Sequence, residues 1–452
     1  MKKNTPRRNR LLQRVVSGIR FKQIALLSFF AFALCIRPNL ATGQTNTEPL
    51  EVRSITENAQ AADSTKVWPQ KLSGKSTWEK IVSVPGQVLY LPIELTLEIP
   101  KQAIGLAYQG KFIYQVMDFL VADDGSKGIL PVYKARTGGG LKFFHKGFLS
   151  NHTSARLILS GGTLQRQYYA LKINQGFSGT FQGSLFASYT KLPNEYFYGI
   201  GNESEKNGQT NFTREISSFG AAIDIGLRDN LALDVTVGVD FNNIFAGRSS
   251  SQPQVGEIHN VGAIPGFENK IELGKVLAKI TYDYRNRPGS PTKGLRASFG
   301  SGIFTETGDE KYEFYQFTTD VTTYLHLFYN RYLVLRAAGQ VSRPFSNREV
   351  PFTYFSELGE EETIRGFRRG RFIDRDMVLS SIEYRWPVHE RIDATLFVDA
   401  GKVAHDIFDE FSGGDFHTGY GFGLRFWNKA GLLTKVQIAK SKDGFHFYLD
   451  LN

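Results

Sequence analysis

The stretch IDIGLRDNLALDVTVGVDF, residues 223–241, alternates apolar and polar side chains on both sides of a short turn at Asp229-Asn230. From Leu231 to Phe241 every second residue is Leu, Val or Phe, and the residues between them are Ala232, Asp234, Thr236, Gly238 and Asp240. The apolar positions are Ile223, Ile225, Leu227, Leu231, Leu233, Val235, Val237, Val239 and Phe241. A period of two over runs this long, joined by a two-residue turn, predicts antiparallel strands between an apolar and a polar environment.

The same alternation recurs through residues 129–452 and predicts sixteen strands. We expect them at 129–136, 138–148, 154–162, 166–175, 180–192, 211–228, 231–245, 269–285, 295–304, 312–327, 331–344, 374–387, 391–403, 417–427, 431–440 and 444–452. The hairpin at Arg136-Thr137-Gly138 could instead be part of one long strand. An even number of strands returns both ends of the chain to the same side of a membrane.

The length of these runs separates two all-β architectures. Strands of soluble proteins usually have about 5–6 residues, whereas a tilted strand that crosses a bilayer needs about 9–11. Slipping 223–241 by one residue would place Asp224, Arg228, Asp234 and Asp240 in lipid, where a basic residue costs about 2–4 kcal/mol at the midplane and an acid somewhat less. The fold class predicted is therefore all-β, a transmembrane antiparallel β-barrel.

The net charge of +10 is concentrated in the first 43 residues, which contain nine Lys or Arg and no acidic residue. A basic stretch precedes the apolar run IALLSFFAFALCI (24–36) and the small-x-small site Ala41-Thr42-Gly43, a pattern typical of a cleaved signal peptide. The apolar run has thirteen residues, and a spanning helix needs about 20, which disfavours the alternative of an uncleaved anchor. We therefore interpret 1–43 as a signal peptide.

Two further segments precede the predicted barrel. Residues 44–75 are polar and without period, which predicts a disordered periplasmic tether. Residues 76–128 begin with the capping-box pattern Ser76-Thr77-Trp78-Glu79 and continue as apolar stretches broken by prolines, which predicts an amphipathic helical segment at the periplasm or membrane interface. The alternation at 93–99 would also fit a strand. Whether this segment plugs the barrel or lies on the membrane stays open.

A cluster of arginines lies in the long connection 345–373. Residues 363–372 contain four arginines: Arg365, Arg368, Arg369 and Arg371. Nucleic acid is disfavoured because no aromatic stacking platform accompanies them. Two kinds of partner remain for these arginines. Arg368, Arg369 and Arg371 could bind lipid A phosphates, or the arginines could pair with acidic residues inside the same protein. The eight histidines show neither metal spacing nor an organised catalytic triad, so we expect no enzyme activity, no metal site and no cofactor.

Two short motifs flank the predicted strand 374–387. Ile364-Arg365-Gly366-Phe367 and Phe397-Val398-Asp399-Ala400-Gly401 resemble the (V/I)-R-G-(F/Y) loop and F-x-D-x-G strand signatures of the BamA/TamA family, also called the bacterial surface antigen barrels. The resemblance covers residues 129–452. It implies that the loop 345–373 folds into the lumen of the barrel, where the arginine of its signature contacts acids on the wall.

Strand alternation gives the same picture of the wall. It places Ser381, Glu383 and Arg385 in the lumen, with Ile382, Tyr384 and Trp386 toward lipid. It likewise places Phe397, Asp399 and Gly401 inside on the next strand. A guanidinium left unpaired there would cost several kcal/mol. We therefore predict that Arg365 bridges Glu383 and Asp399, and that Gly366 permits a tight turn beside it.

The resemblance also implies a function and a place. Family members insert nascent β-barrels into the outer membrane of diderm bacteria, through a weak seam between first and last strands that serves as a lateral gate. Here the seam would join 129–148 to 444–452, a strand whose outward residues are Phe445, Phe447, Leu449 and Leu451. The expected partners are nascent outer-membrane proteins, outer-membrane lipids and lipid A.

One feature departs from the family. Residues 44–121 have too little patterned sequence for even one POTRA domain, the periplasmic module that captures substrates. The expectation is therefore a barrel that assists insertion or translocation of proteins without its own POTRA domains, and that a separate periplasmic partner could serve. Lipid handling, another accessory role and passive solute diffusion are the alternatives.

Overall fold

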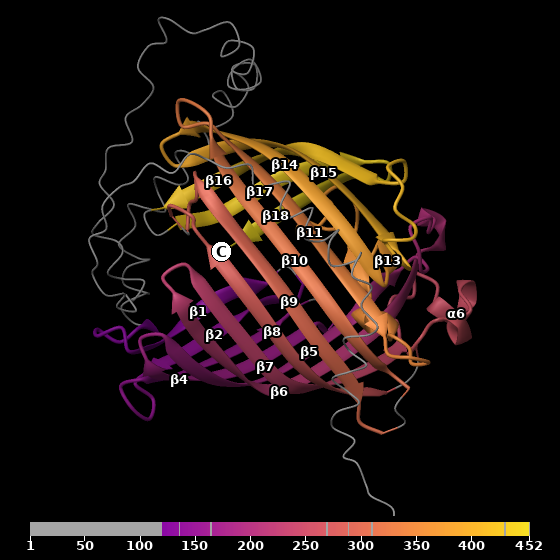
Figure 1. The fold of residues 1–452 in the computed structure, drawn as a ribbon, viewed down its shortest axis with the longest axis horizontal. Helices are drawn as coiled ribbons and strands as arrows, with labels where there is room; N and C mark the ends of the chain where they lie inside the picture. The colour runs from indigo at the N-terminus through magenta and orange to yellow at the C-terminus, as the bar shows by residue number, and fades with distance from the viewer. Residues whose placement is uncertain are drawn as a thin grey trace, which may run out of the picture. The chain divides into compact units, whose positions relative to one another are not determined.

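The computed structural model describes residues 120–451, apart from 135, 163–164, 268–269, 288, 309–310 and 429–430. The predictions for residues 1–119 lie outside the described residues. Within them, sixteen strands form one antiparallel sheet in which each strand pairs with its neighbour in the sequence. Figure 1 shows these strands tilted and curled into a barrel, which confirms the predicted fold class.

The first eight strands of the barrel sheet contain its longest members. They are β1 (Lys127–Lys134), β2 (Gly138–Lys146), β3 (Thr153–Gly161), β4 (Gln167–Ser178), β5 (Phe181–Phe197), β6 (Thr210–Arg228), β7 (Leu231–Ala246) and β8 (Ile271–Asp283). β1 and β2 form a hairpin in continuous register from Lys127↔His145 to Lys134↔Gly138, so the first pair is not one long strand.

The remaining eight strands carry the loop that the sequence singled out. They are β9 (Gly294–Glu306), β10 (Glu313–His326), β11 (Tyr332–Pro344), β14 (Asp376–His389), β15 (Ile392–Ala404), β16 (His417–Asn428), β17 (Gly431–Ser441) and β18 (Gly444–Leu451). Between β11 and β14, the short strands β12 (Ser356–Leu358) and β13 (Phe372–Asp374) pair in a separate two-stranded sheet. The sequence did not predict these two, because three residues are too few to show a period.

Connections of different length lie at the two ends of the barrel. One end, here called the loop end, carries the long connections 198–209, 247–270, 345–375 and 405–416. The other, the turn end, carries mostly short connections such as 229–230 and 390–391. No helix in the part of the chain that the structure describes is long and apolar enough to cross a membrane.

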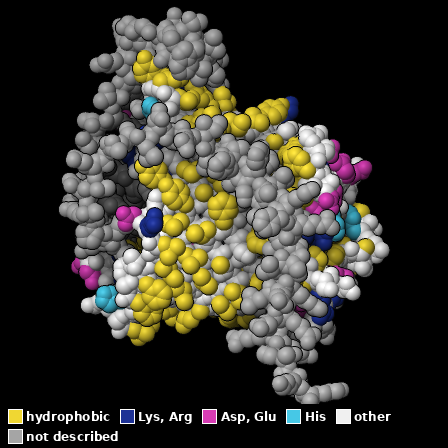
Figure 2. All heavy atoms as spheres, in the orientation of Figure 1, with side chains coloured by type: hydrophobic (Ala, Val, Ile, Leu, Met, Phe, Trp, Pro, Cys, Tyr) yellow, Lys and Arg dark blue, Asp and Glu magenta, His cyan; other side chains and the backbone are white. Residues whose placement is uncertain are grey.

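The two faces of the sheet differ as the alternation predicts. Ile223 pairs with Val235 and Asp224 with Asp234, so like residues share a face. Ile223 and Val237 are exposed on the outer face, whereas Asp240 is buried inside. Figure 2 shows hydrophobic side chains gathered over the strands of the face in view, with most visible charges toward its margins. Further exposed apolar residues of the strands are Leu157, Leu159, Leu171, Leu185, Phe219, Val276, Ile280, Phe299, Ile303, Ile382, Val398, Tyr420 and Ile438.

An apolar core lies at the loop end. It joins wall residues with the connection 247–270, which contains α6 (Val255–Ile258) and η4 (Val261–Ala263), and with η5 (Phe352–Tyr354). Its members include Phe197, Phe212, Val255, Ile264, Ile271, Leu273, Phe304, Phe314, Val350, Phe352, Phe355 and Ile373. Aromatic rings from wall and loop pack edge to face, with 5.8 Å between the centroids of Phe212 and Phe352. The loops are thus packed into the loop end by burial of apolar surface.

The two ends of the sheet are its edges. β1 pairs with β2 and β18 pairs with β17. Among the residues described, no backbone ladder joins β1 to β18. Both strands have eight residues, against nineteen in β6. The edge strands are therefore among the shortest in the sheet. Within the described residues, the outer edge of β1 is bridged to Val121 at Gly128, and the rest of that edge and the outer edge of β18 have no ladder partner.

Candidate functional site: the docked loop

Arg365 is the centre of a buried polar cluster on the inner wall of β14 and β15. Its Nε and Nη2 atoms donate to the two carboxylate oxygens of Asp399 at 2.7 and 2.6 Å. Its Nη1 donates to Glu383 Oε1 at 2.7 Å, and Nη2 also contacts Ser381 Oγ at 3.1 Å. Asp399 is 0% exposed and Arg365 only 4%. The structure thus brings Arg365, Glu383 and Asp399 together in one bidentate and one single charge-assisted contact.

The charge of Arg365 is secured by this arrangement. Burial alone would lower the pKa of its guanidinium. The hydrogen bonds to Asp399 and the nearby charge of Glu383 outweigh burial and raise that pKa above its ordinary value. The guanidinium is therefore always charged, and its attraction to both acids offsets their desolvation.

Each residue of the strand signature contacts the loop signature. The ring of Phe397 lies under the guanidinium, with its centroid 3.5 Å from Arg365 Cζ. Asp399 also accepts the backbone N–H of Arg365 at 3.0 Å. At Gly401, an added Cβ would come within 2.8 Å of Ile364 Cδ1. Phe397 therefore stacks on the guanidinium of Arg365, Asp399 binds the backbone of the loop, and Gly401 leaves room for the side chain of Ile364.

Gly366 turns the loop toward the last two strands. Its φ of +94° is a left-handed conformation that glycine adopts without strain. Its N–H donates to Tyr448 Oη of β18 at 2.9 Å, and its carbonyl accepts from Ser441 Oγ of β17. Phe367 is 1% exposed and packs edge to face on Phe372, with 5.3 Å between centroids. The loop is thus bound to β14, β15, β17 and β18.

β16 contributes space rather than a side chain. A Cβ on Gly419 would lie 1.7 Å from the carbonyl oxygen of Arg365. The inward positions Gly419, Gly421 and Gly423 alternate with the outward Tyr420 and Phe422 in the run GYGFGLRF. This stripe was not predicted from the sequence, although glycine at every second position of a strand is itself a signal that another backbone approaches closely.

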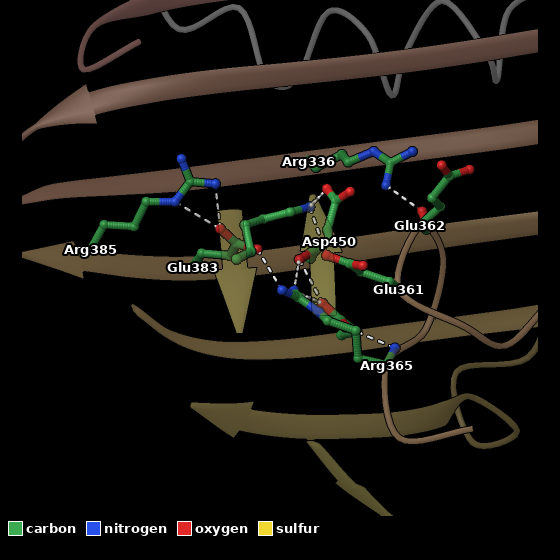
Figure 3. A network of polar contacts seen from close by, with 10 residues as sticks. Arg336, Glu361, Glu362, Arg365, Glu383, Arg385 and Asp450 are labelled. Carbon is green, nitrogen blue, oxygen red and sulfur yellow. Dashed lines mark hydrogen bonds and ion pairs between the residues drawn. The ribbon is translucent and has the colours of Figure 1, made fainter. Parts of the chain in front are cut away.

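The cluster extends over neighbouring strands, as Figure 3 shows. Arg385 donates from Nε to Glu383 Oε2 at 2.8 Å, so Glu383 lies between two arginines. Lys435 of β17 contacts Glu361 of the loop at 2.6 Å and Asp450 of β18 at 3.1 Å. Arg336 of β11 donates to the carbonyl of Glu362 at 2.6 Å. Cations and carboxylates of the wall thus both contact the docked loop.

The other arginines of the loop have different surroundings. Arg371 is buried, and its Nε donates to Asp443 at 2.6 Å while Nη1 donates to the carbonyl of Ser204 at 2.8 Å. Arg369 contacts Glu360 at 2.9 Å and Glu357 at 3.3 Å. Arg368 is exposed, with its Cζ 5.3 Å from the ring centroid of Tyr196. Of the three arginines considered for lipid A phosphates, only Arg368 is exposed.

A second anchor holds the same loop to strands on the other part of the sheet. Tyr354 Oη donates to Asp240 Oδ2 of β7 at 2.9 Å, and Lys275 of β8 contacts Asp240 Oδ1 at 2.6 Å. Arg214 of β6 donates to the carbonyl of Thr353 at 2.7 Å. The loop therefore contacts β6 and β7 through Thr353 and Tyr354, and β14–β18 through residues 361–367. This anchor was not predicted from the sequence, where its only local signal is the aromatic run PFTYF (351–355) inside a long loop.

The predicted seam residues have outward side chains on β18. Phe445, Phe447 and Leu449 are 69%, 66% and 45% exposed, while the side chain of Leu451 lies outside the described residues. On β14 and β15, Ile382 and Val398 are exposed on the outer face. Trp386, predicted to face lipid, is buried in a cluster with Val388, Ile392 and Ala394. Within the described residues, no three His, Cys, Asp or Glu side chains are grouped so that they could hold a metal ion.

Comparison with known proteins identifies the family. Residues 131–443 match the model of the Omp85 superfamily domain. A solved structure of BamA from Haemophilus ducreyi lacking POTRA domains 1-3 is 15% identical, with a TM-score of 0.53, and the match covers 71% of this chain and 69% of that chain. CdiB from Acinetobacter baumannii is 11% identical, with a TM-score of 0.44 over 71% of this chain and 58% of that chain. No curated protein sequence matches the chain.

The family model covers well over half of the chain, and the BamA structure independently shows the same fold. The resemblance read from the loop and strand signatures is therefore confirmed at the level of the family. The chain belongs to the Omp85 superfamily and is a sixteen-stranded β-barrel of the outer membrane of Gram-negative bacteria.

Proposed function

We propose that this barrel assists the insertion or translocation of other proteins at the outer membrane, without POTRA domains of its own. The observation that carries the proposal is the pair of free edges. β1 and β18 end the sheet without a ladder between them in the described residues. An unpaired strand edge is a template on which another chain can add a strand. Nascent outer-membrane proteins supply such strands.

The docked loop supports a seam at this place. Tyr448 and Asp450 of β18 and Ser441 of β17 contact the loop or its partners, so the loop holds the last strands from inside. β18 is thereby kept in place although one of its edges has no ladder. An edge strand that the loop holds from inside (β18), next to an edge strand that no ladder joins to it (β1), is a suitable arrangement for a lateral gate.

A passive solute channel fits the arrangement less well. The loop is anchored on β7 by Tyr354 and on β14 and β15 by Arg365, and its apolar residues pack into the loop end with those of 247–270. Such a plug obstructs diffusion. We expect the purified protein to show little steady conductance in a planar bilayer, and a variant lacking 349–373 to show a large increase.

Depletion of the protein in its own host tests the proposal directly. Outer-membrane proteins are quantified by mass spectrometry after depletion, with re-expressed wild-type protein and Arg368→Ala as matched controls. We expect one or several barrel proteins to fall while their precursors accumulate, and both controls to restore them. Unchanged barrel proteins would overturn the proposal, and altered lipid composition in the same cells would point to lipid handling.

A further inference from the structure

All Asp, Glu, Lys and Arg positions in the first strands of the barrel are Lys or Arg. Between Asp124 and Glu195 the sequence contains nine Lys or Arg and no acidic residue. Two of the nine find acids at the edge of this region, in the ion pairs Arg136–Glu195 and Lys191–Glu215. β1 to β4 themselves supply no acid at all.

Three of these cations lie near one another on the inner face. Leu141 of β2, Leu157 of β3 and Leu171 of β4 are exposed on the outer face. Adjacent residues of a strand point to opposite faces, so their neighbours Lys142, Arg156 and Lys172 point inward. Arg156 lies directly opposite Lys172 in the register. Lys142 is diagonal to Arg156, which pairs with Phe144. We call these three residues the lumenal cation row.

The row lacks counter-ions in the described part of the barrel. No ion pair joins Lys142, Arg156 or Lys172 to an acid there, although Asp224 lies near enough to Lys172 to interact with its charge. Asp224 is opposite Asp234, which already contacts Lys279 at 3.4 Å. Like charges directly opposite in a sheet are destabilising. The sheet therefore carries a repulsion that an anion from outside the strands would relieve.

Apolar side chains are interleaved with the row. Leu130, Lys142, Ile158 and Ala170 follow one another across β1 to β4 at one level of the inner face. Gly128, Phe144, Arg156 and Lys172 follow at the next. The surface is thus basic and partly apolar. It begins at β1, whose outer edge is bridged to Val121 at Gly128 and has no ladder partner beyond it in the described residues.

We propose that this surface binds acidic, partly apolar stretches of an unfolded client polypeptide next to the free edge of β1. The inference rests on the proposed function and names the class of client segment. A strand added to β1 would lie two strand spacings from β2, about 10 Å, which a Glu on the client and the side chain of Lys142 together can span. Polypeptide is favoured over lipid because the row faces the lumen, opposite the bilayer-facing Leu141, Leu157 and Leu171.

The test measures binding of a synthetic peptide to the full-length protein in lipid nanodiscs. The probe is a fluorescent amphipathic peptide with alternating Glu, compared with the same peptide carrying Gln in place of Glu. The variant is Lys142→Gln with Arg156→Gln. The matched control, Arg287→Gln with Lys293→Gln, removes the same charge from the exposed β8–β9 turn. Lys172 is left in place because of its neighbour Asp224.

We expect the acidic peptide to bind the variant about tenfold more weakly than wild type at low salt, and the control within about twofold. Added salt should narrow the difference, because the charges are partly exposed. Equal binding by variant and wild type would overturn the proposal. So would unchanged peptide binding together with loss of co-purified anionic phospholipid, which would identify a lipid as the occupant.

The outcome is separable from that of the depletion experiment. If depletion leaves outer-membrane proteins unchanged while peptide binding still depends on the row, the proposed function fails and the binding surface stands. If depletion lowers barrel proteins and the row variant binds peptide normally, the function stands and the row is not its client site.

Discussion

Two walls of the same barrel differ in whether their inward-facing cations have carboxylate partners. At β14–β18, Arg365 of the docked loop contacts Asp399 and Glu383 of the wall, Arg385 contacts Glu383, and Lys435 contacts Glu361 of the loop and Asp450, all within about 3 Å. On β1–β4, Lys142 and Arg156 have no such partner in the described residues, and Arg156 lies opposite another cation. On the first wall these carboxylates and cations are paired with one another, although the Nε of Arg425 on β16 has no hydrogen-bond partner. The second wall carries cations without a carboxylate partner.

The difference indicates a division of labour along one sheet. Where the guanidinium of the loop and the carboxylates of the wall are paired with one another, wall and loop are held rigid and these groups are not available to an incoming chain. Unmatched cations beside a free edge cost stability and retain that capacity. The β14–β18 wall therefore holds the loop, and the β1–β4 wall is the side where a client can be bound.

Removing the central cation of the paired wall should have the largest effect. Arg365→Ala leaves Asp399 and Glu383 buried with fewer partners, so we expect a loss of about 3–5 kcal/mol in the free energy of unfolding. Urea titration in detergent, followed by tryptophan fluorescence, measures it. Arg368→Ala removes an exposed arginine from the same loop and should change stability by less than about 0.5 kcal/mol. Equal stability of the two variants would show that the network does not hold the loop.

The fit of the loop against β16 gives a smaller effect. Gly419→Ala would place a Cβ 1.7 Å from the Arg365 carbonyl, so the loop must shift. We expect a loss of about 1–3 kcal/mol in the free energy of unfolding, as for other overpacked sites. Gly413→Ala, where an added Cβ meets nothing within 4 Å, is the control. Limited proteolysis of 345–375 should accelerate in the first variant only, and identical cleavage would argue against close docking.

The hydrogen bonds from β18 contribute less. Tyr448→Phe removes the acceptor of the Gly366 N–H and the donor to the Phe367 carbonyl while keeping the ring. The expected loss is about 1 kcal/mol. Tyr420→Phe on the outer face is the matched control, because its side chain is 52% exposed. Both variants are compared in the same urea titration, and a Tyr448→Phe protein as stable as the control would show that β18 does not hold the loop by these bonds.

The sequence predicts the wall better than it predicts what fills the barrel. Strand alternation is a local signal, so all sixteen barrel strands were placed within a few residues, apart from the extension of β5 to Phe197. The contacts of Arg365 were also expected, because strand phase puts Glu383 and Asp399 inside. The Tyr354–Asp240 contact was missed because it joins residues 114 apart that share no period. Gly419 was not predicted because its contribution is the missing side chain, which leaves room for the carbonyl of Arg365.

A substitution on the β1–β4 wall should change the free energy of unfolding least, and in the direction of higher stability. Arg156→Gln removes one of two cations that face each other across β3 and β4. Because like charges are destabilising and the side chain is exposed, we expect stability to stay equal or rise by up to about 0.5 kcal/mol at low salt. The gain should vanish at high salt, where the repulsion is screened. A loss as large as that of Arg365→Ala would mean that Arg156 has a structural partner, and the two walls would then not differ as argued. A neutral or positive change with weaker binding of the acidic peptide would separate stability from function on this wall.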